Sequence, residues 1–112
     1  MSEPADEETP EGAAVFPLIP AELGVHPLLL AVLHAYVFLE GSDPHVLNGT
    51  VAEEAMEYLA TYLQRLSGPD LQRVREDFAT LVAFAKGERW PKQQVRFLQD
   101  FLSENAVGES TK

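Results

Sequence analysis

Apolar residues recur three and four positions apart over the second half of the chain, and one dense apolar run precedes them. This spacing is typical of amphipathic helices, and no segment alternates apolar and polar residues for long enough to predict a strand. The pattern therefore predicts an all-α fold, a small bundle of about four main helices. The expected helices cover residues 27–40, 50–66, 69–87 and 91–107.

The dense run, "HPLLLAVLHAYVFLEG" at residues 26–41, has apolar side chains on nearly every face. A helix of about 13 residues spans roughly 20 Å, which is too short for a hydrocarbon layer of about 30 Å. A short helix that is apolar all round is usually a buried central helix. We therefore expect the other three helices to enclose it, with His34 in the core or half-buried beneath them.

Capping residues mark the helix ends. Pro27 suits the first position of the first helix, where its missing N–H is harmless, and His26 is placed to cap that helix. Thr50 and Glu53 match a capping box at the start of the second helix. Gly68 is a left-handed stop, and the short links that follow favour antiparallel packing of the last three helices.

The segments outside the helices predict one domain with two tails. Residues 1–14 are acidic and lack large apolar side chains, so we expect a disordered tail there. Residues 15–107 form the single helical domain, and residues 108–112 a frayed end. Within the domain, the Pro-rich segment 15–24 is expected to lay apolar side chains on the core as a strap, ending in one helical turn closed by Gly24.

Charge is divided unevenly along the chain. The formal net charge is −10, yet all 8 Lys and Arg residues lie at or after Arg65. The first 64 residues would repel phosphates, so we do not expect nucleic acid to bind there. There is no cysteine, and the acidic N-terminus does not resemble an export signal, so we expect a cytoplasmic protein without disulfides.

No catalytic motif is present. The sequence has no Gly-x-Gly-x-x-Gly, Walker or Gly-x-Ser-x-Gly pattern. His26 and His34 are too far apart on one helix to share a metal, and Asp43 with His45 makes only half of a site. Glu53, Glu54 and Glu57 suit the N-terminus of a helix. We therefore expect neither an enzyme nor a cofactor or metal.

The link between the last two helices, "KGERWPKQQVR", gathers cations around the only tryptophan. Trp and Arg are enriched where proteins bind one another. Trp90 could instead plug the end of the bundle, and the cations could contact phosphates. The candidate partner-binding residues are Lys86, Arg89, Trp90, Lys92, Arg96, Phe97 and Phe101.

These features favour a non-enzymatic protein-interaction module of adaptor or regulatory type. Its expected partner is another protein or a second copy of the chain, and neither nucleic acid nor a membrane is expected. One alternative is an acidic inhibitor that mimics nucleic-acid charge against a basic protein. Its surface would consist of Glu40, Asp43, Glu53, Glu54 and Glu57. A carboxylate–histidine metal-binding protein is the other alternative.

Overall fold

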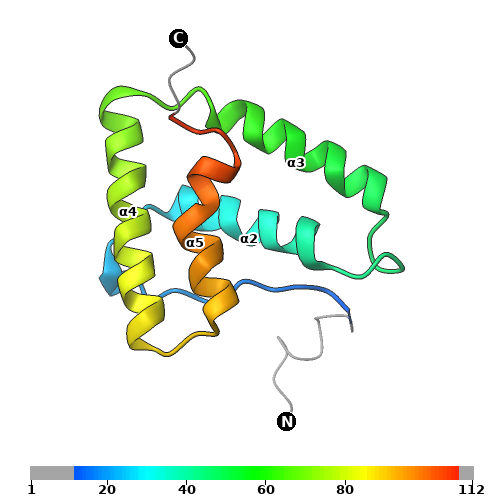
Figure 1. Cartoon of the computed structure of the whole chain (residues 1–112), viewed down its shortest axis with the longest axis horizontal. Coiled ribbons are helices and arrows are strands. Elements are labelled where there is room, and N and C mark those ends of the chain that lie inside the picture. Colours follow the sequence, from blue (N-terminus) through cyan, green and yellow to red (C-terminus); the bar gives the residue numbers. More distant parts are fainter. Residues whose placement is uncertain (1–11, 109–112) are drawn as a thin grey trace.

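Two antiparallel helix pairs make up the part of the chain that the computed structural model describes, residues 12–108. Helix α2 (Pro27–Gly41) packs on α3 (Gly49–Leu63), and α4 (Gly68–Gly87) packs on α5 (Lys92–Glu104). In Figure 1 the first pair runs across the molecule, and the second pair runs along its left side. Residues 12–108 contain no strand, which confirms the predicted all-α fold.

The pairing differs from the prediction at α3. That helix was expected to be an antiparallel neighbour of α4, but it packs chiefly on α2 instead. Residues 64–67 turn the chain between α3 and α4, so that the two helices diverge in Figure 1. The link is short, but its length does not fix the angle at which the chain leaves it.

The start of α2 is capped as the sequence predicts. Pro27 occupies the first turn, and the Nδ1 atom of His26 accepts a hydrogen bond from the Leu28 N–H at 3.1 Å. Just before it, the short 3-10 helix η1 (Ala21–Leu23) ends at Gly24, which has a φ of 75°. A residue with a Cβ rarely adopts that left-handed conformation, so glycine suits this position.

The start of α3 is capped by a residue other than the predicted one. The Oδ1 atom of Asn48 accepts hydrogen bonds from the N–H groups of Thr50 and Val51, at 2.9 and 3.1 Å. The capping box of Thr50 and Glu53 is therefore wrong. Because α3 begins at Gly49, Thr50 already lies inside its first turn, and Asn48 takes the capping position.

The centre of the core joins α2, α4 and α5. Leu33, Leu81, Leu98 and Phe101 are the largest side chains that are fully buried there. Phe16, from the strap before η1, is 5% exposed and closes one end of the same core. Burying each of these side chains contributes about 1.5–3 kcal/mol. Helix α3 contributes only Ala52 to the buried residues, so it covers one flank of α2.

The strap is only partly laid on the core. Phe16 is buried and Ile19 half-buried, whereas Val15 is 51% and Leu18 94% exposed. Most of the predicted tail, residues 1–11, lies outside the described residues, as does 109–112 at the other end. Residues 12–14 run beside the loop after α2, where the Ala14 N–H donates to the Ser42 Oγ at 2.9 Å.

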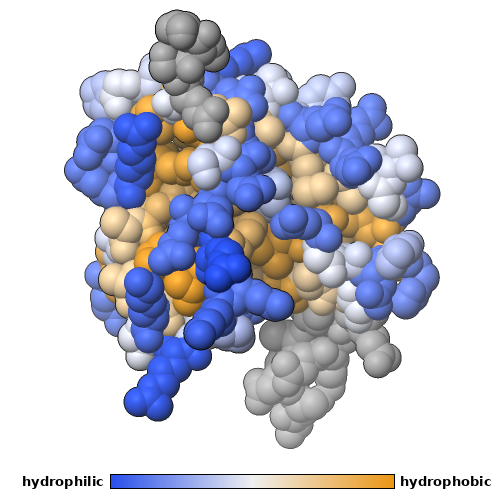
Figure 2. All heavy atoms as spheres, in the orientation of Figure 1, coloured by the Kyte–Doolittle hydropathy of each residue, from blue (hydrophilic) through white to orange (hydrophobic). Residues whose placement is uncertain are grey.

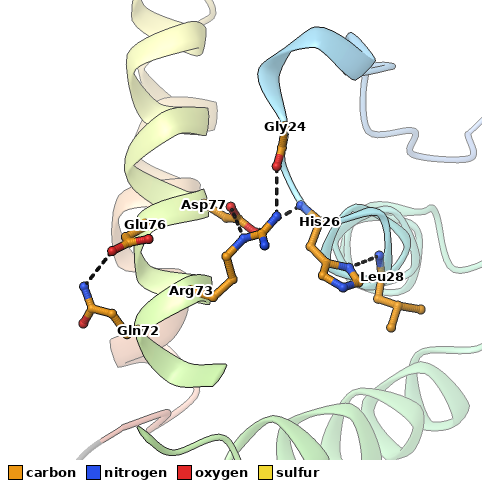
Figure 3. Close-up of polar contacts among 7 residues, drawn as sticks. All are labelled: Gly24, His26, Leu28, Gln72, Arg73, Glu76 and Asp77. Carbon is orange, nitrogen blue, oxygen red and sulfur yellow. Dashed lines mark hydrogen bonds and ion pairs between the residues drawn. The ribbon is translucent and has the colours of Figure 1, made fainter. Parts of the chain in front are cut away.

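A polar contact fixes the start of α2 against α4 (Figure 3). Asp77 of α4 is 5% exposed, and its Oδ2 atom accepts a hydrogen bond from the His26 N–H at 3.1 Å. The Arg73 guanidinium donates to the same carboxylate at 3.0 Å and to the carbonyl oxygen of Gly24 at 3.0 Å. This cluster satisfies a buried carboxylate and two backbone groups at once.

Helix α2 is contacted by the other helices but is not enclosed by them, so the prediction that three helices enclose it is wrong. Leu29 and Leu33 are buried, but Leu28 is 71% and Phe38 36% exposed. His34 is also exposed and does not lie in the core. The reason is geometric, because α3 covers one flank of α2 while α4 and α5 meet another. Among the described residues, no helix combines the length and apolarity needed to cross a membrane.

Candidate functional site

Four cations surround a depression along the outer face of the α4–α5 pair. Its α4 side carries Arg75 and Lys86, and its α5 side carries Lys92 and Arg96. The depression has two parts, with volumes of about 530 and 330 Å³, and Lys86 and Gln99 line both of them. We call this surface the cationic groove. Figure 2 shows apolar surface between hydrophilic side chains over α4 and α5.

The floor of the cationic groove is apolar. It is formed by Ala79, Val82, Ala83, Val95, Leu98 and Leu102. Ala79 and Ala83 are exposed, whereas Leu98 is 1% exposed and belongs to the core. The groove therefore combines an apolar floor with a charged rim, an arrangement common at sites where proteins bind one another.

No carboxylate lines the cationic groove within residues 12–108. The ion pair in this part of the chain joins Arg73 to Asp77, and none of the four groove cations pairs with another described residue. In a chain with a formal net charge of −10, this is a local concentration of positive charge. Such a patch attracts anionic groups from solution and raises the rate of their encounter.

Trp90 lies at one end of the groove and faces the protein. It is half-buried, and its ring makes edge-on contacts with Phe16, at a centroid distance of 5.8 Å, and with Phe84, at 6.1 Å. These contacts match the reading of Trp90 as a plug over the end of the bundle. Its remaining surface still lines the groove beside Lys92.

Arg89 lies in the turn between α4 and α5 and does not line the groove. The residue is exposed, and its φ of 62° is in the left-handed region. Its charge adds to the positive charge of the turn between α4 and α5. Its backbone conformation is unfavourable for a residue other than glycine.

The two predicted phenylalanines lie elsewhere. Phe101 is 2% exposed and packs on Phe78 and Tyr36, at centroid distances of 5.3 and 5.0 Å. Phe97 is half-buried and contacts Tyr36 at 6.0 Å, on the side of α5 that faces α2. The structure thus gathers Lys86, Trp90, Lys92 and Arg96 at the groove, and it places Phe101 in the core.

Sequence reasoning missed the far half of the groove. This half contains Arg75, Ala79, Val82 and Leu102. Arg75 is 11 residues from Lys86, so it does not stand out as part of the same cluster in the sequence. Residues 75, 79, 82 and 86 are three or four positions apart, so they lie on one face of α4. This spacing is the sequence signal that could have shown that Arg75 and Lys86 share a face. The contribution of Leu102 follows only once α5 is known to lie antiparallel to α4.

The five acidic residues of the alternative hypothesis are all exposed. Glu40 lies in the last turn of α2, and Asp43 lies in the following loop. Glu53 and Glu54 lie in the first half of α3, and Glu57 lies just past its midpoint. The loop that joins α2 to α3 is drawn at the right of Figure 1. The five acidic residues thus lie on the α2–α3 pair and the loop that joins it, whereas the cationic groove lies on the other helix pair.

Tyr36 lies in a small depression between α2 and α5, lined also by Glu40, Asp100 and Glu104. Arg96 of the cationic groove lines this depression as well. Burial raises the pKa of its hydroxyl above 10.0, and the negative charges of Glu40 and Glu104 raise it further, against a hydrogen bond with Asn105 that lowers it. Asp43 and His45 are exposed loop residues. Within residues 12–108, no group of three or more His, Asp or Glu side chains is arranged to hold a metal ion.

A second, mainly apolar groove of about 270 Å³ lies where α2, α3 and α4 meet. Leu28, Val32, Leu63, Leu66 and Val74 form most of its lining. His26, Asp70 and Arg73 form its polar edge. No pattern in the sequence pointed to this groove, because its residues come from three helices and only the divergence of α3 from α4 opens it.

Comparison with known proteins finds no matching protein family, no matching curated protein and no matching solved structure.

Proposed function

We propose that the chain is a non-enzymatic protein-interaction module that binds a partner protein at the cationic groove. The observation that carries this proposal is the groove's composition: four cations without a described carboxylate partner surround an apolar floor. Cations that served only solubility would not need to converge on apolar surface. A partner that covers both the charge and the floor gains from hydrophobic burial and from charge complementarity together.

In this proposal the module acts by binding alone. Trp90 holds the strap against the end of α4 through its contacts with Phe16 and Phe84, and thereby keeps the groove in shape. A rigid surface loses little conformational entropy on binding. We place the module in the cytoplasm, where a fold without cysteine loses no stability to a reducing environment.

Site-specific crosslinking tests the proposal. Gln99 is exposed and lines both parts of the groove, so a photoreactive residue in its place samples any bound partner. Gln72 is also exposed on this helix pair but lines neither part, so the same residue there is the matched control. We expect a specific protein to crosslink saturably from position 99 and not from 72, with competition by excess native chain. Equal crosslinking at both positions would contradict the proposal.

Charge mimicry is a second candidate, because the five exposed acidic residues all lie on α2, on α3 or in the loop between them. This candidate predicts that the Glu53→Lys variant loses the partner while the Lys92→Glu variant retains it. The groove proposal predicts the opposite result. Measuring capture of the crosslinked partner by both variants therefore distinguishes the two candidates.

A further inference from the structure

The charge of the cationic groove restricts the chemistry of what it binds. Lys86, Lys92 and Arg96 line one part, Arg75 lies in the other, and no described acidic side chain is among the lining residues. A neutral or basic ligand would leave these charges uncompensated or would be repelled by them. The ligand that fits is one that presents carboxylates or phosphates to the rim.

The apolar floor of the groove favours a protein that carries carboxylates over a nucleic acid. Ala79, Val82 and Leu102 present aliphatic surface, and apolar contact is what a partner helix offers and what a phosphate backbone does not. Two aromatic residues line the groove, and neither offers a free ring. The ring of Trp90 packs edge-on against Phe16 and Phe84. Phe78 is 5% exposed and stacks on Phe101. A surface for stacking bases would instead need exposed aromatic rings.

The shape of the groove suits a helix. It runs between two antiparallel helices, and the small side chains of Ala79 and Ala83 allow a third helix to approach closely. Arg75 and Lys86 are 11 residues apart on α4, a distance of roughly 16 Å along the helix axis. About three turns of a bound helix would span these two cations.

We infer that the cationic groove binds an amphipathic helix of a partner protein, with carboxylates on both sides of an apolar stripe. This inference rests on the proposed function and names the chemical class of the partner. The apolar stripe lies on Ala79, Val82 and Leu102. The carboxylates that flank the stripe face Arg75 and Lys86 on the α4 side, and Lys92 and Arg96 on the α5 side.

Fluorescence anisotropy on the full chain tests this inference. The probe is a labelled helical peptide of about 18 residues, made of Leu at helical spacing and Glu elsewhere, which spans roughly 27 Å. The same peptide with Lys in place of Glu, and a DNA duplex of similar length, serve as competitors. We expect the acidic peptide to bind with an affinity that falls as salt rises, and neither competitor to displace it.

Two variants separate docking in the groove from charge attraction alone. Lys92→Glu should weaken binding of the acidic peptide by about tenfold or more. Arg65→Glu makes the same charge change in the turn after α3, outside the groove, and should change binding by less than about twofold. Ala79→Arg adds a cation but fills the floor at an exposed helix position. We expect it to weaken binding by about tenfold. Circular dichroism of each variant verifies that its helices are intact.

Several results would overturn the inference. Tighter binding by Ala79→Arg, or displacement of the peptide by DNA, would show that charge alone or nucleic acid governs the groove. Tighter binding after neutralising the acids of residues 1–11 would assign the groove to the chain's own N-terminal segment, and loss of binding as the chain self-associates would assign it to a second copy. The crosslinking from position 99 tests the proposed function separately from this inference. A partner captured there that the acidic peptide does not displace refutes the inference and leaves the proposed function standing, whereas no partner at that position refutes both.

Discussion

Replacing Asp77 tests whether the buried polar contact in Figure 3 stabilises the fold. The Asp77→Ala variant leaves the His26 N–H without its acceptor, at a site where the aspartate is 5% exposed. An unpaired buried donor costs about 1–3 kcal/mol. The lost ion pair adds only about 0–1 kcal/mol, because the Arg73 side chain is 48% exposed and water screens its charge. We therefore expect a loss of about 2–3 kcal/mol in the free energy of unfolding.

The assay is urea unfolding followed by far-ultraviolet circular dichroism, with two comparison variants. Asp77→Asn keeps a side-chain oxygen that can accept from the His26 N–H, so it should cost about 1 kcal/mol or less. Glu76→Ala removes the same charge from the neighbouring position, where the side chain is exposed and accepts a hydrogen bond from Gln72, and should cost below about 0.5 kcal/mol. If Asp77→Ala and Glu76→Ala unfold at the same urea concentration, the argument from burial fails.

Three further predictions concern single side chains. The folded state keeps the Tyr36 hydroxyl protonated, so the free energy of unfolding should decline as pH rises above 10.0, and Tyr36→Phe should reduce that decline. In a spectrophotometric titration, a Tyr36 midpoint at or below 10.0 would contradict this prediction. Asn48→Ala should cost about 1 kcal/mol in thermal unfolding, whereas Thr50→Ala should cost much less; the reverse order would restore the capping box. Leu33→Ala, at a position 0% exposed, should cost about 2–5 kcal/mol, whereas Leu28→Ala at 71% exposure should cost under about 1 kcal/mol; similar losses would mean that α2 is enclosed after all.

The sequence predicted the helices well because local physics determines them. The spacing of apolar residues, the proline at Pro27 and the glycine at Gly24 each determine the structure of only a few neighbouring residues. The starts and ends of α2 and η1 could therefore be derived. The error at α3 is of the same local kind. Both Asn48 and Thr50 can cap a helix, and the choice between them depends on where the preceding loop releases the chain.

The uncovered face of α2 could not be derived in the same way. Its apolar residues are spread evenly around the helix, so the pattern gives no direction in which the core lies. Uniform apolarity is compatible with full enclosure by the chain itself, or with partial enclosure that leaves Leu28 and Phe38 outside. Only the placement of α3 decides between them, and that placement depends on contacts distant in sequence.

The cationic groove was predicted at one end and missed at the other. Lys86, Trp90, Lys92 and Arg96 are close in sequence, so the corner was visible as a cluster of cations around a tryptophan. Arg75 lines the same groove because α4 is continuous from Arg75 to Lys86, and Leu102 does so because α5 packs beside α4. Phe101 shows the converse limit, since a wide apolar stripe does not reveal which of its aromatic residues turns inward.

At Arg89, in the turn between α4 and α5, the residue that would best stabilise the backbone is not one that carries a positive charge. A left-handed φ of 62° costs an ordinary residue about 1–2 kcal/mol, and glycine would relieve that cost. An engineer seeking a more heat-resistant variant would therefore choose Arg89→Gly, and in doing so would remove one positive charge from the turn. Thermostability and anion attraction are thus opposing design goals at this single position.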